Sequence, residues 1–305
     1  MQLRIPNYKF LIPQIEYFLF LGDSNLILSQ RNAEWCGHGP VLEQDIAITN
    51  ISLDLIGQAR NFYQYAATLI NQQQNESKTN SQFPIPNSNT SQPNSQFPIP
   101  NSKSNSSQPN SQFPIPNSST TEDTLAYHRD VRDFKNLLLV EQPNGDWAQT
   151  ILRQFFFSNY QYHLLQALQQ SADEQVAAIA NKSFKEVSYH LRWSSEWVVR
   201  LGDGTEESRR RILEAIELLW PFTGEMFTPA GYELEVSRSG IGVDPSTLKK
   251  AWYENLRSVF EEAKLTVPKD AWSQNGGKSG THSEHLGYIL AELQFMQRAY
   301  PGNEW

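Results

Sequence analysis

Apolar residues recur at helical spacing in four long segments of this chain, and this pattern limits the fold more than any other feature. The segment 41–70 carries apolar residues around most of its circumference, which is typical of a helix buried on several sides. Similar patterns predict helices at about 14–31, 146–170 and 172–201. Long helices with such broad apolar surfaces bury them against one another, so the sequence predicts an all-α bundle.

Shorter helices are predicted after the bundle, at about 206–226, 245–264 and 283–299. The last follows Thr281-x-x-Glu284, which matches a capping box. Strand patterns are almost absent, and only the stretch YELEVSRSGIGV (232–243) could form a small hairpin.

One internal segment, 72–121, has a composition unlike that of the helices. It consists mainly of Asn, Gln, Ser and Pro, and the nonapeptide NSQFPIPNS occurs in it at Asn80, Asn94 and Asn110. Its prolines oppose a helix and its few apolar groups cannot form a core, so we predict a disordered, low-complexity repeat insert. A docking role for the repeats is the alternative. The sequence thus predicts a single domain, 1–305, interrupted by this insert.

The charge balance and the single cysteine exclude several classes of protein. The chain has 33 acidic and 25 basic side chains, a formal charge of -8, without the basic cluster that nucleic acid requires. Cys36 alone can form neither an internal disulfide nor a cysteine-rich zinc module. No stretch has the apolar length of a membrane span, and the first residues lack a signal-peptide cleavage pattern. We therefore expect a cytoplasmic protein with no nucleic-acid or membrane partner.

Polar residues on the helix at 41–70 are the first candidate functional residues. Asp45 falls among apolar positions, which predicts a buried carboxylate that needs a partner. A second stripe contains Asp54 with Glu43, Asn50 and Asn61. It is either the solvated edge of the helix or part of an interior site.

The helix at 172–201 carries Glu186 and His190 on one stripe. Ferritin-like di-iron proteins use Glu-x-x-His units, which place both ligands on one helix face. Here Tyr189 stands three residues after Glu186, and His190 arrives one place late. The helix at 41–70 has no histidine, so the chain offers carboxylates without the two imidazoles. This shortage of histidine ligands predicts that a metal site has been lost.

The remaining histidines and the cysteine favour structural roles. His163 lies alone on an apolar helix face, which is typical of a hydrogen-bonded core residue. His282 and His285 have a spacing that could hold a metal, but no second ligand pair supports it. Cys36 and His38 belong to a Gly/Pro turn.

Four long stretches resemble the structural subunits of bacterial phenylacetyl-CoA 1,2-epoxidases. The likeness covers nearly the whole chain outside the insert. The stretches are LGDSNLILSQRNAEWCGHGPVLEQDIAITNISLDLIGQARNFYQYAA, NLLLVEQPNGDWAQTILRQFFF, KEVSYHLRWSSEWVVRLGDGT and GGKSGTHSEHLGYILAELQFMQR.

This resemblance implies a ferritin-like four-helix bundle with additional short helices, acting as the structural subunit of a multicomponent monooxygenase. The complex would epoxidise the aromatic ring of phenylacetyl-CoA in phenylacetate catabolism. A related catalytic subunit would hold the di-iron centre and pair with this chain, and other subunits would join the same complex. A reductase with FAD and an iron–sulfur centre would supply electrons from NADPH. No catalytic, cofactor-binding or metal-binding residue is expected in this chain itself.

The resemblance also implies that five residues are remnants of a metal site, held by hydrogen bonds and ion pairs. They are Asp45, Asp54, Glu186, Tyr189 and His190. Two alternatives stay open: a free-standing di-iron or di-manganese oxygenase, and a helical scaffold unrelated to oxygenases.

Overall fold

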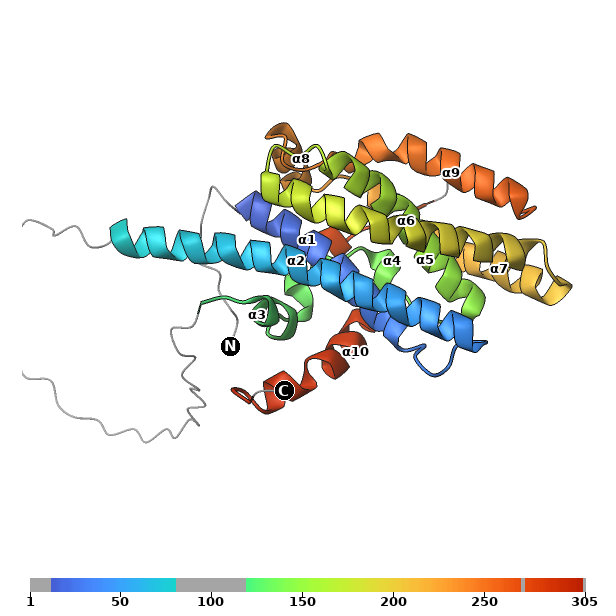
Figure 1. Ribbon diagram of the computed structural model, residues 1–305, viewed down its shortest axis with the longest axis horizontal. Helices are drawn as coiled ribbons and strands as arrows, with labels where there is room; N and C mark the ends of the chain where they lie inside the picture. Colours follow the sequence, from blue (N-terminus) through green and yellow to red (C-terminus); the bar gives the residue numbers. More distant parts are fainter. Residues whose placement is uncertain (1–11, 81–118, 270–271, 304–305) are drawn as a thin grey trace, which may run out of the picture.

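Four long helices form the body of the molecule in the computed structural model, which describes residues 12–80, 119–269 and 272–303 (Figure 1). They are α1 (Ile12–Ala33), α2 (Leu42–Asn80), α5 (Trp147–Leu168) and α6 (Glu174–Gly202). α1 packs chiefly on α2 and α5 on α6, and α2 also contacts α6, so two helical hairpins close into one bundle. The described residues contain no strand, and the prediction of an all-α, ferritin-like bundle is confirmed.

Helix α5 is buried on nearly every side, and its buried side chains include polar as well as apolar residues. Phe155, Phe156 and Phe157 are all buried, although they are consecutive and point in three directions. Burying each such ring stabilises the fold by roughly 1.5–3 kcal/mol. The helix begins where the Asp146 carboxylate accepts a hydrogen bond from the Gln149 backbone N–H at 3.0 Å.

A buried ion pair ties α1 to the segment that follows the insert. The Arg129 guanidinium pairs with Asp23 of α1, and both side chains are nearly or fully inaccessible to solvent. The Tyr63 hydroxyl of α2 donates to the same carboxylate at 2.5 Å, and Arg129 donates to the Asp133 carbonyl at 3.1 Å. Burial lowers the pKa of Arg129, but the charge of Asp23 outweighs this effect and raises it, so the guanidinium stays charged.

The shorter helices depart from the predicted ranges in detail. α7 (Glu206–Leu219) ends seven residues before the predicted limit, and short 3₁₀ turns follow it through Phe227. α9 (Lys249–Glu262) lies within its predicted range, and the last predicted helix is divided into α10 (Glu284–Leu293) and α11 (Phe295–Ala299). The predicted capping box is wrong, because Ser283 and not Thr281 is the N-cap of α10.

The predicted hairpin is also wrong, because its first half forms α8 (Gly231–Arg238). Tyr232 and Val236, one helical turn apart, are both buried. A helix places these two side chains on one face. Two helices were not predicted, α3 (Glu122–Tyr127) and α4 (Leu138–Glu141).

The insert begins later than the sequence predicted. α2 continues through Asn80, so residues 72–80 are helical and that part of the prediction is wrong. The Asn71 side chain donates to the Thr120 carbonyl and accepts from the Thr120 N–H, both at 2.8 Å, which fixes the returning chain against α2. Residues 81–118, with the repeats, lie outside the described residues, so their disorder and the single-domain organisation stay predictions.

None of the described helices combines the length and the apolar character needed to cross a membrane.

Candidate functional site

A chain of hydrogen bonds crosses the bundle interior and takes one side chain from each long helix. Gln58 of α2 donates from Nε2 to Glu186 Oε2 of α6 at 2.8 Å. Gln161 of α5 donates to Gln58 Oε1 at 3.1 Å and also to Asn25 Oδ1 of α1. Asn25 donates in turn to the Leu21 carbonyl at 2.9 Å. The three amide side chains are buried and Glu186 is half-buried, so this polar network lies inside the bundle.

The polar network has the helix arrangement of a ferritin-like di-iron centre but not its ligands. Such a centre takes a carboxylate from each of four helices and a histidine three residues after two of them. Here carboxamides stand at Asn25, Gln58 and Gln161, and the residues three after Gln58 and Glu186 are Asn61 and Tyr189.

Amide side chains are neutral, so the polar network supplies one negative charge where two iron ions need several. Hard divalent cations favour carboxylate oxygens, and the imidazole ligands are replaced too. No group of three or more His, Cys, Asp or Glu side chains in the described part of the chain could hold a metal ion. The residues do not fit a di-iron centre, whereas amides that both donate and accept suit a hydrogen-bonded chain.

Asp54 and His190 form a second contact between α2 and α6, beside the polar network. His190 is fully buried, and its Nε2 lies 2.9 Å from Asp54 Oδ2. The Asp54 side chain is 37% exposed, so solvent screens the pair. The structure thus brings Asp54, Glu186 and His190 to the contact between α2 and α6, and their origin as remnants of a metal site stays a prediction.

The prediction that Asp45 is a buried carboxylate is wrong. Asp45 is only partly buried in the first turn of α2, where its Oδ2 accepts from the Gly39 N–H at 3.0 Å. The backbone N–H groups of Gly39, followed by Gly37, lower the pKa of Asp45. A Cβ at Gly39 would lie 2.8 Å from Asp45, so glycine permits the loop to approach. The helical position of Asp45 suggested that its side chain points into the core. In the first turn of α2, however, that side of the helix faces the loop between α1 and α2.

Tyr189 lies on the surface and takes no part in the polar network. Its ring is 38% exposed, and the guanidinium of Arg192 lies 5.8 Å from the ring centre. The side chain at the expected ligand position is therefore partly exposed to solvent.

Asn25 and Gln161 were missed from the sequence. Asn25 follows Asp23 and Ser24, and Gln161 lies close to Ser158 and Asn159. Each stands in a short polar run within a helix that also carries many apolar residues, and such a run is the signal that could have identified them. Gln58 lies beside the stripe that contains Asp54. That stripe borders α6 and is partly solvated rather than wholly interior.

His282 forms a buried pair with Glu141. Its Nδ1 lies 2.9 Å from Glu141 Oε2, and its Nε2 lies 2.9 Å from the Phe134 carbonyl oxygen. Both ring nitrogens face acceptors, so the imidazolium form satisfies both contacts. Burial lowers the pKa of His282, but the hydrogen bond and charge of Glu141 outweigh it, so the net shift is upward. His163 is half-buried, and burial lowers its pKa.

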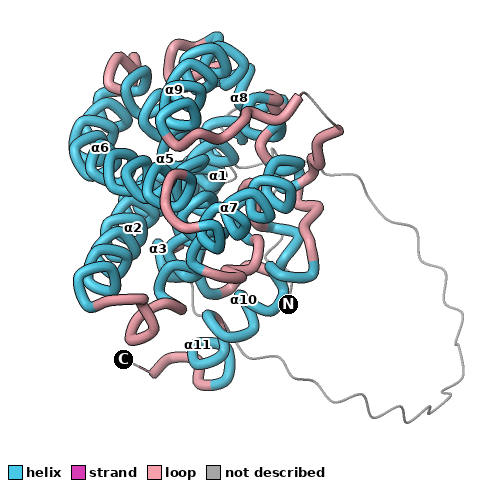
Figure 2. The backbone as a smooth tube through the Cα atoms, turned by 90° about the vertical axis from the view of Figure 1, so that its right-hand side faces the viewer, coloured by secondary structure: helices cyan, strands magenta, loops and turns pink. Residues whose placement is uncertain are grey.

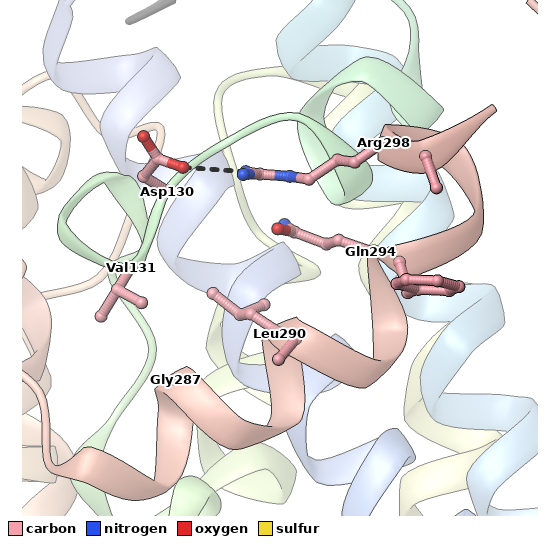
Figure 3. Close-up of a pocket in the computed structure, with 9 residues that line it drawn as sticks. Asp130, Val131, Gly287, Leu290, Gln294 and Arg298 are labelled. Atoms are coloured by element: carbon pink, nitrogen blue, oxygen red, sulfur yellow. Dashed lines mark hydrogen bonds and ion pairs between the residues drawn. The ribbon is translucent and has the colours of Figure 1, made fainter. Parts of the chain in front are cut away.

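One groove shares no lining residue with the polar network (Figure 3). Its volume is about 480 Å³, and α10, α11 and the turn at 130–131 line it. Arg298 at its rim pairs with Asp130 at 2.9 Å and donates to the Arg129 carbonyl at 2.9 Å. The remaining lining is mostly apolar, including Leu290. The charged groups of this groove are already paired with each other or with backbone.

The sequence of this chain is similar to those of known proteins. A family model described as Phenylacetic acid catabolic protein matches residues 9–87 and 115–305. The unmatched residues are the first eight and residues 88–114 in the middle of the repeat segment. The chain is 43% identical over 289 residues to one of the subunits of the 1,2-phenylacetyl-CoA epoxidase of Escherichia coli (strain K12). The alignment covers 95% of this chain and 98% of that protein.

Proposed function

Because the chain belongs to the phenylacetic acid catabolic protein family, we propose that it is a non-catalytic, structural subunit of a multicomponent di-iron monooxygenase. The complex epoxidises the aromatic ring of phenylacetyl-CoA in phenylacetate catabolism. A related helical subunit holds the di-iron centre, and a reductase carries FAD and an iron–sulfur centre and takes electrons from NADPH. The complex works in the cytoplasm.

The single observation that carries the non-catalytic role is the polar network of Asn25, Gln58, Gln161 and Glu186. It occupies the four-helix position of a metal centre with three neutral amides and one carboxylate. The network links α6 through α2 and α5 to α1 by hydrogen bonds alone. A bundle held in this way needs no metal to keep its helices in register, which suits a subunit whose task is to support a partner.

The relative in Escherichia coli supports the choice of complex, since its name makes it one subunit of a phenylacetyl-CoA epoxidase. The alternative of a free-standing di-iron or di-manganese oxygenase needs ligands that the polar network does not supply.

The test is metal analysis joined to turnover. The chain is purified alone and with the second family member from the same genome, after growth in iron-rich medium. We expect iron to follow the second subunit, and phenylacetyl-CoA epoxidation to need both chains and the reductase. About two irons per chain in the isolated protein, with an oxo-bridge absorption band, would show that it is itself a di-iron oxygenase.

A further inference from the structure

We propose that Asn275 is a site of self-catalysed deamidation, at which the folded chain converts one of its own asparagines to aspartate or isoaspartate. The inference does not depend on the proposed function. Asparagine followed by glycine is the dipeptide most prone to this reaction, because glycine has no side chain to shield its backbone nitrogen. The sequence contains this dipeptide twice, at Asn144-Gly145 and at Asn275-Gly276.

The reaction needs only the chain itself and water. The Gly276 backbone nitrogen attacks the side-chain carbon Cγ of Asn275, and a bond forms between these atoms while the bond from Cγ to Nδ2 breaks. The proton of the Gly276 N–H leaves on the departing nitrogen, which is released as ammonia. Water then opens the cyclic succinimide at either of its carbonyl groups and gives aspartate or isoaspartate. No oxidant, reductant or other reactant is consumed.

Asn275 lies in the connection between α9 and α10, where one long hydrogen bond holds its side chain. The described part of this connection is loop apart from a short 3₁₀ turn, Gly277–Ser279 (Figure 2). Asn275 is exposed, and within the described residues its amide makes a single hydrogen bond, to the Ser273 carbonyl at 3.4 Å. A contact of this length is weak, so the side chain can turn toward the next backbone nitrogen.

The attacking nitrogen is fixed in place and has a carboxylate beside it. The Gly276 N–H donates to Glu225 Oε1 at 2.8 Å, and Glu225 is 2% exposed. The Gly276 carbonyl accepts from the N–H groups of Ser279 and Thr281, both at 2.9 Å. The attack requires the amide nitrogen to give up its proton, and Glu225 lies where it can receive that proton and pass it on. Burial raises the pKa of Glu225, which makes its carboxylate a stronger base.

The other Asn-Gly dipeptide is held by its surroundings. Asn144 Nδ2 donates to the Arg31 carbonyl and to Glu34 Oε2, both at 2.7 Å. The Oδ1 atom of Asn144 accepts from the buried guanidinium of Arg153. These bonds hold both ends of the amide, and they must break before Cγ can reach the next backbone nitrogen. Of two dipeptides with the same sequence, the structure therefore leaves only the one at Asn275 ready to react.

Conversion disturbs the contacts that this loop makes with the rest of the fold. Both products add a carboxylate next to Gly276, whose N–H is bound by Glu225, and isoaspartate also adds one carbon atom to the main chain. A Cβ on Gly277 would lie 2.2 Å from the Asn136 carbonyl oxygen, so the loop has no room to move inward. Glu225 Oε2 accepts from the Leu138 N–H at 2.8 Å, so a displaced Gly276 also loosens the start of α4.

The experiment follows both dipeptides by peptide mass spectrometry. The full-length chain is incubated at neutral pH, folded in buffer and, in parallel, unfolded in guanidinium chloride. Electron-transfer fragmentation distinguishes aspartate from isoaspartate at each position. We expect Asn275 to react at least as fast in the folded chain as in the unfolded chain. Folding should slow Asn144 about tenfold or more, because its hydrogen bonds must break first.

Asn275→Gln provides the matched control. Glutamine keeps the amide, but its longer side chain must close a larger ring and reacts far more slowly. During prolonged incubation the melting temperature of the wild-type chain should fall as isoaspartate accumulates, whereas Asn275→Gln should keep its initial value. Asn275→Asp carries the added charge without the extra main-chain atom, so its melting temperature should lie between those of the unmodified and the isoaspartate-containing chain.

Three results would overturn the inference. A slower reaction of Asn275 in the folded chain than in the unfolded chain would show that the loop protects this residue. Equal rates at Asn144 and Asn275 in the folded chain would show that the hydrogen bonds of Asn144 do not separate the two positions. An equal fall in the melting temperatures of the wild type and Asn275→Gln would show that a different modification is responsible. None of these results bears on the proposed function.

Discussion

Replacing Glu186 removes the acceptor of the Gln58 amide and separates a structural from a catalytic role. Glu186 is half-buried and its bond to Gln58 is 2.8 Å long, whereas the Gln58 side chain is 1% exposed. In Glu186→Ala, Gln58 Nε2 loses its partner, and a buried unsatisfied donor costs about 1–3 kcal/mol. This is less than the roughly 3–5 kcal/mol of a broken buried ion pair, because Gln58 is neutral.

The isolated Glu186→Ala subunit should therefore melt several degrees lower, since domains of ~150–250 residues lose about 2–4 °C per kcal/mol. Turnover per assembled complex should equal that of the wild type. Differential scanning calorimetry, iron content and epoxidation by size-purified complex give the three readouts. Glu196→Ala, an exposed glutamate on the same helix, is the matched control and should change none of them.

Glu186→Gln makes the test sharper, because glutamine still offers a carbonyl oxygen to Gln58. A structural role predicts near-normal stability and normal turnover for this variant. An iron ligand would behave in the opposite way, giving a stable complex with less iron and lower turnover. That result would refute the interpretation of the polar network as a substitute for a metal site.

Three further predictions concern the parts of the fold that hold the bundle together. Arg129→Met should destabilise the subunit by roughly 3–5 kcal/mol in urea unfolding, because the buried Asp23 carboxylate loses its partner; an effect below about 1 kcal/mol would contradict it. The raised pKa of His282 means that its pair with Glu141 contributes fully below about pH 6.5 and less as pH rises through that raised value. The melting temperature should fall over that range, and Glu141→Gln should flatten the dependence. Deleting 88–114, which the family model leaves unmatched, should leave melting temperature and partner binding unchanged, and a large loss of either would show that the repeats make contacts.

The sequence was sufficient for the long helices because their apolar periodicity is strong. α5 and α6 lie within two residues of the predicted starts and ends. The end of α2 was misplaced because the polar composition after residue 72 was taken as the end of the helix. The hydrogen bond between Asn71 and Thr120 joins residues far apart in the sequence, so the sequence pattern could not reveal it. α8 was mistaken for a strand because the apolar pattern of such a short segment fits both the helical and the strand period.

The candidate site could be predicted only in part, since a helical angle gives a direction and not a neighbour. The sequence pattern placed Glu186 and His190 on one helix face, but it could not show that Asp54 of α2 lies against His190 and that Gln58 lies against Glu186. Asp45 pointed toward a loop that the periodicity could not reveal. Asn25 and Gln161 escaped because a hydrogen-bonded amide network has no fixed spacing along the chain.

Helix α2 presents a different chemistry on each side. Gln58 faces the bundle and continues the polar network, while Leu53 is 62% exposed and a Cβ at Gly57 would meet nothing within 4 Å. A metal centre at the network would stabilise α2 through its ligands, and in this chain neutral amides do so through hydrogen bonds. The hydrogen bonds of Gln58 therefore fix the position of α2 without a bound iron ion. A bundle whose helices are fixed in this way offers a partner a preformed surface, which lowers the entropy lost on binding.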